Sequence, residues 1–218
     1  CNVEVDGLIY SVGGDVSHFD TAFYPQISED DKAVINRYVE VFDPQNKEWF
    51  VKSSAQLPSS LLSQEKNGTA CAVVGKNIYV FGGFNEENPE IKQVEIYNTE
   101  TNTWATDTEL MPEALSYMGN TNNIVINDKV YLMGGVKNPT APNMLFSAAV
   151  LRYSPDNMND KWKMVEDIPQ MATEILGESI DGEAYYSAIA LDGVIYKFGG
   201  ELSMGEAEIL SPIVSKFR

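Results

Sequence analysis

The chain has 218 residues, of which 44% are hydrophobic and 22% are charged, and this balance excludes an intrinsically disordered chain. It carries 32 Asp and Glu against 15 Lys and Arg, which gives a formal charge of −17. Because phosphate contacts need clustered Lys and Arg, this charge argues against nucleic acid or an anionic membrane as the partner. It favours a soluble protein that selects neutral or basic partners.

Targeting signals are sparse. The sequence contains neither an apolar run of membrane-spanning length nor a signal-peptide pattern, although it begins at Cys1, as a processed chain or part of a longer one does. Cys1 and Cys71 lie in apolar, strand-like contexts, so we expect two small buried thiols. Asn67-Gly68-Thr69 fits a glycosylation sequon, a short pattern that often arises by chance. The compartment stays open, with a cytoplasmic location favoured.

A motif made of a tight turn, an apolar strand with a tyrosine, and a glycine pair recurs four times. The four sets are Tyr10 with Gly13 and Gly14, Tyr79 with Gly82 and Gly83, Tyr131 with Gly134 and Gly135, and Tyr196 with Gly199 and Gly200. The first glycines stand at 13, 82, 134 and 199, so successive motifs are 69, 52 and 65 residues apart. Turn pairs such as Asp6-Gly7 tolerate the positive φ that two-residue hairpin turns require.

A second pattern follows the first three glycine pairs. It consists of an alternating strand at 39–43, 94–98 or 149–153, a polar turn, and then Trp49, Trp104 or Trp162. After the fourth glycine pair, residues 213–217 predict the start of the same strand, with no fourth tryptophan. Each unit therefore reads as four antiparallel strands, which is typical of a β-propeller blade. We predict one all-β domain over 1–218, with repeats at 1–66, 67–118, 119–183 and an incomplete 184–218.

These motifs closely resemble the kelch repeat. The match consists of the glycine pair after an apolar strand, the tyrosine three positions before it, the Val-Glu-Ile-Tyr-Asn strand at 94–98 and the following tryptophan. The resemblance implies a kelch-type β-propeller, in which the glycines and aromatic residues serve packing. Kelch propellers usually have five to seven blades. The chain is therefore expected to be part of a larger propeller or to be completed by a second copy, and the alternative is a compact four-blade ring.

The long connections, between strands two and three and between strand four and the next strand one, emerge at one rim. They cover residues 15–36, 53–67, 84–92, 107–119, 136–147, 166–184 and 201–208. Binding residues concentrate on loops held by a rigid scaffold, and kelch domains typically use this rim. The candidate partner-binding residues are Phe19, Phe23, Tyr24, Phe84, Met144 and Phe146. The alternative is that they only fold the loops onto the propeller.

Charge on the same loops gives a second candidate feature. The acidic side chains on these loops are Glu29, Asp30, Asp31, Glu86, Glu87 and Glu90. They would attract a basic peptide, and the alternative is that they form a solvated acidic surface. Self-association, or pairing with a missing portion of the propeller, is the other partner prediction.

The sequence contains few features of a catalytic site. His18 is the one histidine, no Gly-x-Ser-x-Gly elbow occurs, and spaced metal ligands are absent from the sequence, so we predict no catalytic residue, metal or cofactor. The leading hypothesis is a non-enzymatic protein-interaction module or scaffold. One alternative is a carbohydrate-active propeller, either glycoside-active or similar to the sialic-acid mutarotases, whose pattern residues 131–138 loosely match. The other is a structural subunit completed by another chain.

Overall fold

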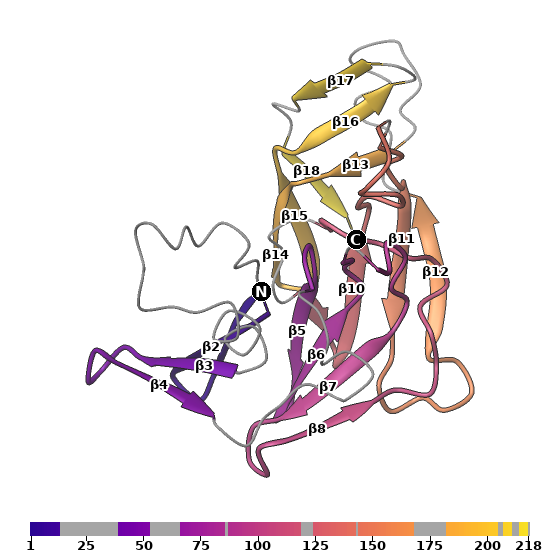
Figure 1. Ribbon diagram of the computed structural model, residues 1–218. Coiled ribbons are helices and arrows are strands. Elements are labelled where there is room, and N and C mark those ends of the chain that lie inside the picture. The colour runs from indigo at the N-terminus through magenta and orange to yellow at the C-terminus, as the bar shows by residue number, and fades with distance from the viewer. Residues whose placement is uncertain are drawn as a thin grey trace.

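A computed structural model describes residues 1–13, 39–52, 66–85, 87–118, 124–142, 144–167, 182–204, 207–210 and 214–217. All regular secondary structure within these ranges is β-strand. Four antiparallel sheets, one in each repeat, have their strands in chain order along the motif, and we call these sheets blades 1 to 4 (Figure 1). Within the same ranges, no helix is long and apolar enough to cross a membrane.

Three blades have four strands each, and the fourth has three. Blade 1 consists of β1 (Asn2–Val5), β2 (Leu8–Val12), β3 (Val39–Asp43) and β4 (Glu48–Lys52). Blade 2 consists of β5 (Ala70–Val74), β6 (Asn77–Phe81), β7 (Val94–Asn98) and β8 (Thr103–Thr106). Blade 3 consists of β9 (Val125–Ile126), β10 (Lys129–Met133), β11 (Ala149–Tyr153) and β12 (Trp162–Asp167). Blade 4 consists of β14 (Ser187–Leu191), β15 (Val194–Phe198) and β18 (Val214–Phe217), so the strand predicted near 213–217 is present.

The turns between the first two strands of each blade follow from their residue types. Asp6 and Gly7 have φ of 53° and 81°, and Asp192 and Gly193 have φ of 50° and 73°. Positive φ at both central positions matches the right-handed twist of the flanking strands, which is why such pairs favour two-residue hairpins. The turn chemistry therefore sets the register in which the tyrosine strands pair.

The glycine pairs lie where one blade meets the next. The amide of Gly83 donates to the carbonyl oxygen of Leu115 at 3.0 Å, and the amide of Gly135 donates to that of Glu183 at 2.7 Å. Leu115 and Glu183 hold equivalent places in successive repeats. A Cβ on Gly82, whose φ is 59°, would overlap the Leu115 carbonyl, so only glycine allows this approach. Gly14 lies outside the described residues.

Each interface between neighbouring blades has its own apolar core. Tyr10 of blade 1 packs with Tyr97 of blade 2 in the first core. Phe81 of blade 2 packs edge-on against Tyr153 and Trp162 of blade 3 in the second. Because β6 is buried on both faces, its run from Ile78 to Phe81 is apolar throughout, as expected for a sheet between two others.

The first interface also carries a disulfide. Cys1 and Cys71 are bonded to each other across a sequence separation of 70 residues, so the expectation of two buried thiols was wrong. Cys71 is on β5, and Cys1 immediately precedes β1, which packs beside β5. The bond therefore ties blade 1 to blade 2. Spacing could not reveal it, because only the packing of β1 on β5 brings the two residues together.

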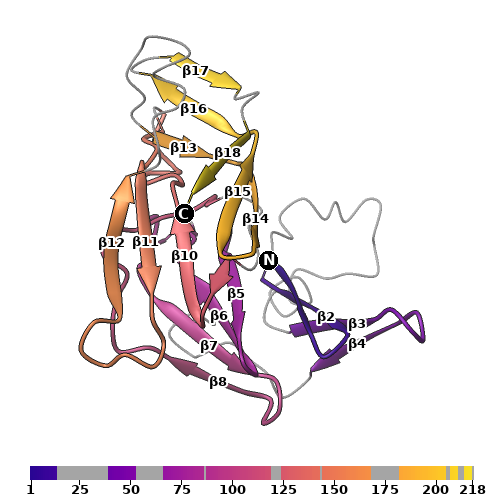
Figure 2. The same cartoon turned by 180° about the vertical axis from the view of Figure 1, so that it is seen from behind.

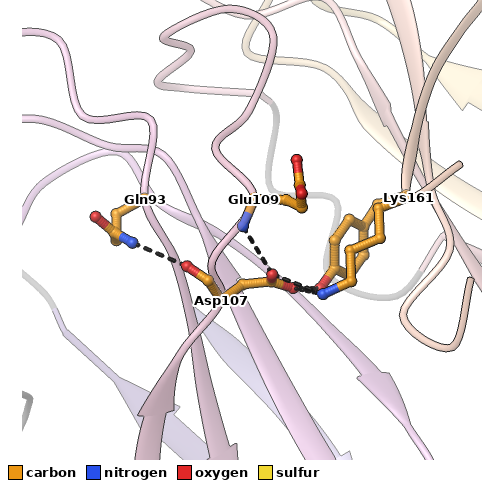
Figure 3. A network of polar contacts seen from close by, with 5 residues as sticks. Gln93, Asp107, Glu109 and Lys161 are labelled. Atoms are coloured by element: carbon orange, nitrogen blue, oxygen red, sulfur yellow. Dashed lines mark hydrogen bonds and ion pairs between the residues drawn. The ribbon is translucent and has the colours of Figure 1, made fainter. Parts of the chain in front are cut away.

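A polar network holds blade 2 against blade 3 (Figure 3). The Asp107 carboxylate accepts hydrogen bonds from Lys161 Nζ at 2.7 and 2.8 Å, from the Glu109 amide at 2.9 Å and from the Tyr153 hydroxyl. Gln93 Nε2 donates to the Asp107 backbone carbonyl at 3.2 Å. The network joins the end of β8 to β11 and the β11–β12 turn.

One expected loop is a hairpin. Residues 201–208 were assigned to a long loop, but β16 (Glu201–Met204) pairs with β17 (Ala207–Leu210) and with β13 (Gly182–Ala184). These three strands form a small sheet above β14 and β15 at one end of the molecule (Figure 2). The glycines at 199 and 200 separate β15 from β16, and their positive φ allows the chain to continue as a strand in a new direction.

Candidate functional site

The long-loop rim is built by the same short pairing in three blades. Each pairing joins a residue that precedes the first strand to the residue directly after the glycine pair. In blade 2 this is Asn67 with Phe84, in blade 3 it is Ser116 with Val136, and in blade 4 it is β13 with β16. The rim is therefore a repeated layer with its own backbone hydrogen bonds, rather than a set of independent loops.

Aromatic rings from three blades gather on this layer. The ring centroids are 5.4 Å apart for Phe84 and Tyr117, 5.1 Å for Tyr117 and Tyr185, and 6.1 Å for Phe146 and Tyr185. The Tyr185 hydroxyl lies 3.7 Å from Met144 Sδ. We call Phe84, Tyr117, Met144, Phe146 and Tyr185 the rim aromatic cluster.

Members of the cluster differ in exposure. Tyr185 is 40% exposed, whereas Phe84, Tyr117 and Met144 are half-buried. Phe146 is only 4% exposed and packs with Val136 and Ala184 beneath the others. Tyr185 is therefore the member with the most surface for a partner, and Phe146 supports the cluster from below.

The backbone of the two tyrosines is unusual. Tyr117 and Tyr185 have φ of 49° and 57°, at the position where blade 2 has Gly68 with φ of 65°. A bulky residue at positive φ costs about 1–3 kcal/mol and is often found at functional sites. The three equivalent residues are also linked, since the Tyr117 amide donates to Gly68 O at 2.8 Å and the Tyr185 amide to Tyr117 O at 3.3 Å. The surrounding hydrogen bonds therefore hold both rings in place.

The structure brings three of the predicted candidates together. Phe84, Met144 and Phe146, which are far apart in sequence, all belong to the rim aromatic cluster. Tyr117 and Tyr185 were missed. The available signal was their shared place in the repeat, opposite Gly68. The other candidates lie outside the described residues, and they are Phe19, Phe23, Tyr24, Glu29, Asp30, Asp31 and Glu86.

Two buried ion pairs lie below the rim, one in blade 2 and one in blade 4. Lys66 Nζ is 3.1 Å from Glu95 Oε2, and Lys197 pairs with Glu183. Burial raises the pKa of the Glu95 carboxyl and lowers the pKa of the Lys66 ammonium, and their mutual attraction opposes both shifts. Burial also raises the pKa of Glu183. All four side chains are at most 9% exposed, so they present little charge to a partner.

Features of an enzyme site are few in the part of the chain that the structure describes. It contains no group of three or more His, Cys, Asp or Glu side chains placed to hold a metal ion. Arg152 pairs with Asp160 at 2.8 Å, beside the β11–β12 turn and on the opposite rim. The rim aromatic cluster is thus the best-formed candidate surface, and it offers ring faces and hydroxyl groups.

Comparison with known proteins identifies the repeats. The Kelch motif family matches residues 66–111, which run from the start of blade 2 into the loop after β8. The chain therefore contains kelch repeats. The repeats resemble those of human kelch-like protein 23, with 28% identity over 164 residues, and of kelch-like protein 23 from Pongo abelii, with 30% identity. These matches cover 74% of this chain and 24% of each relative, so the kelch chain spans about a quarter of their length.

A solved structure supports the kelch fold. The structure of YjhT superposes on all of this chain with a TM-score of 0.63 at 16% identity, and the chain covers 68% of that protein. Together with the four-stranded antiparallel blades, this match confirms the predicted kelch-type β-propeller. At this identity the likeness concerns the fold alone.

Proposed function

We propose that this kelch-repeat chain is a non-enzymatic interaction module that binds a protein or peptide through the rim aromatic cluster. The observation that carries the proposal is the contact of Tyr117 with Tyr185, whose ring centroids are 5.1 Å apart and whose backbone is left-handed at both residues. Tyrosine offers a large, rigid surface with a polar tip, which is why it is enriched in binding hot spots. Rings fixed in advance lose little conformational entropy when a partner binds.

Charge sets the expected partner. The chain carries a formal charge of −17, and Glu87 and Glu90, in the loop after Phe84, are exposed. Acidic groups around an aromatic surface attract Lys and Arg, and an Arg guanidinium also stacks on a tyrosine face. The proposal is therefore a basic peptide segment with an aromatic or Arg anchor.

The carbohydrate-active alternative would need a different rim. A pocket with Arg and paired acids would favour it, whereas the described rim presents aromatic rings, and Arg152 pairs with Asp160 at the opposite rim. This contrast supports an interaction module over an enzyme.

Selection from a displayed random-peptide library tests the proposal. The bound peptides should be enriched in Lys and Arg, and fluorescence anisotropy should show at least a tenfold loss of affinity for the Tyr185→Ala variant. Met158→Ala is the matched control, because Met158 is exposed in the β11–β12 turn on the opposite rim. This variant should bind like the wild type.

Two outcomes would overturn the proposal. One is that every selected peptide binds the Tyr185→Ala variant as tightly as the wild type. The other is that no peptide is enriched while N-acetylneuraminic acid binds and the Tyr185→Ala substitution abolishes that binding. The second result would favour the carbohydrate-active alternative.

A further inference from the structure

Blade 4 exposes an apolar face. Ile189 and Leu191 on β14 are 55% and 57% exposed, and Phe198 on β15 is 45% exposed. Tyr196 lies directly opposite Ile189 in the β14–β15 register, so its side chain belongs to the same face. The other face of these strands is covered, because Ile195 is buried against blade 3. We call Ile189, Leu191, Tyr196 and Phe198 the Phe198 face.

Blade 1 exposes a different face. Ile9, Phe42 and Trp49 stand opposite one another across β2, β3 and β4. Trp49 is 63% exposed and Ile9 is 36% exposed. The rings of Phe42 and Trp49 are 5.0 Å apart at an interplanar angle of 35°. We call Ile9, Phe42 and Trp49 the Trp49 face.

The interface between blades 2 and 3 contains the equivalents of both faces, packed against each other. On blade 2, Phe81 is equivalent to Phe198, and Tyr79 is equivalent to Tyr196. The strand register shows this: Phe81 pairs with Ala70 as Phe198 pairs with Ser187. In the same way, Tyr79 pairs with Ala72 as Tyr196 pairs with Ile189. The opposing row on blade 3 matches the Trp49 face position by position and consists of Val130, Tyr153 and Trp162. Tyr153 and Trp162 are 4.8 Å apart at 48°, close to the geometry of Phe42 and Trp49.

In the covered interface, aromatic rings of one blade sit on the Tyr–Trp pair of the next. The ring centroid of Phe81 lies 5.3 Å from that of Tyr153 and 6.0 Å from that of Trp162, and both contacts are edge-on. The ring centroids of Tyr79 and Tyr153 are 5.6 Å apart. The chain therefore exposes, at its two ends, the two halves of an interface that it already forms internally. Since Trp49 and Phe198 are both exposed, the two halves do not cover each other within one chain.

We propose that the Phe198 face of one chain packs on the Trp49 face of a second copy. Two copies related by a two-fold axis form this junction twice, once at each end, and the assembly closes without leaving either face exposed. Contiguous exposed apolar surface of this kind marks interaction sites, and a second copy supplies the matching half in the same register. The junction lies on the blade faces, so it is separate from the rim aromatic cluster.

Sedimentation equilibrium of the 218-residue chain tests the proposal. The wild type should have twice the 24.2 kDa mass of one chain at micromolar concentration. Phe198→Glu and Trp49→Glu should each return the mass to that of one chain, because each variant breaks both junctions. Both side chains are exposed in the single chain, so circular dichroism should show an unchanged fold. Met158→Glu, at an exposed site away from both faces, should leave the mass doubled.

Mixing the variants provides the decisive measurement. A 1:1 mixture of Phe198→Glu and Trp49→Glu should form a dimer, because the Phe198 face of one and the Trp49 face of the other remain intact. A wild-type protein that stays monomeric up to 100 µM would overturn the proposal. A dimer that withstands both substitutions would place the contact elsewhere, and a mixture that stays unassociated would exclude this pairing.

Discussion

The Asp107 carboxylate and the Lys161 ammonium, 54 residues apart, meet at 2.7 Å across the interface between blades 2 and 3 (Figure 3). Burial alone would raise the pKa of Asp107. Hydrogen bonds from the Glu109 amide, Lys161 and Tyr153 outweigh burial, and the pKa lies below its ordinary value. The charged form of Asp107 is therefore favoured by the folded chain and contributes to its stability.

Asp107→Asn should lower the free energy of unfolding at pH 7 by about 3 kcal/mol, since it leaves Lys161 without a counter-charge at a largely buried site. Because the folded pKa is depressed, the contribution of Asp107 is present above the ordinary carboxyl pKa of about 3.9 and is lost as the pH falls through the folded value. Urea unfolding at pH 7 and pH 3 should show a smaller difference between variant and wild type at the lower pH. An equal difference at both would contradict this account.

Gly82→Ala should destabilise the chain by several kcal/mol, because the new Cβ would overlap the Leu115 carbonyl at the blade 2–blade 3 interface. Gly75→Ala is a matched control, since Gly75 has almost the same φ, 61° against 59°, and nothing within 4 Å of a Cβ. The control should show only the cost of the left-handed backbone, about 1–2 kcal/mol. Thermal melts of the two variants that coincide would show that the close approach does not matter.

Lys197→Val should cost about 3–5 kcal/mol, because it leaves the Glu183 carboxylate buried without a partner. The repeats suggest the rescue, since Val80 of blade 2 stands at the position of Lys197 and Leu115, before blade 3, stands at the position of Glu183. Adding Glu183→Leu to Lys197→Val should therefore restore the free energy of unfolding to the wild-type value or above. A double variant as unstable as the single one would mean that the ion pair is needed for its geometry.

Reduction of the Cys1–Cys71 bond should lower the free energy of unfolding by about 4 kcal/mol, as the chain-entropy account predicts for a loop of this length. Cys71→Ala is expected to fold, because blade 4 has Ala188 at the same place in the repeat. A melt with and without reductant should shift for the wild type and stay unchanged for Cys71→Ala. A wild type indifferent to reductant would contradict the bond.

Local features of this fold could be predicted from sequence because they depend on near neighbours. The Asp6-Gly7 and Asp192-Gly193 turns adopt the expected positive φ, and a strand precedes each glycine pair as expected. These features recur in every repeat, so four weak signals combine into a strong one. The resemblance to the kelch repeat, and the propeller it implied, were confirmed on this basis.

The candidate site was predicted only in part. The rim was expected from loop length, and Phe84, Met144 and Phe146 came from residue type. Tyr117 and Tyr185 lie in short segments before a first strand, where a tyrosine looks like an ordinary core residue. Their importance depends on the left-handed backbone and on ring contacts between blades, which no local pattern encodes.

Residue type by itself determined the strands, the turns and the blade motif, because backbone preference and apolar periodicity act within a few residues. Which copy of the motif is buried was decided by tertiary structure alone. The same contact between an aromatic ring and the following tryptophan occurs in three blades, as Phe42–Trp49, Tyr97–Trp104 and Tyr153–Trp162. The first pair leaves its tryptophan exposed, whereas the other two are covered by the preceding blade. The burial of a ring depends on the blade that packs against it, and the strands of that blade are remote from the ring in sequence.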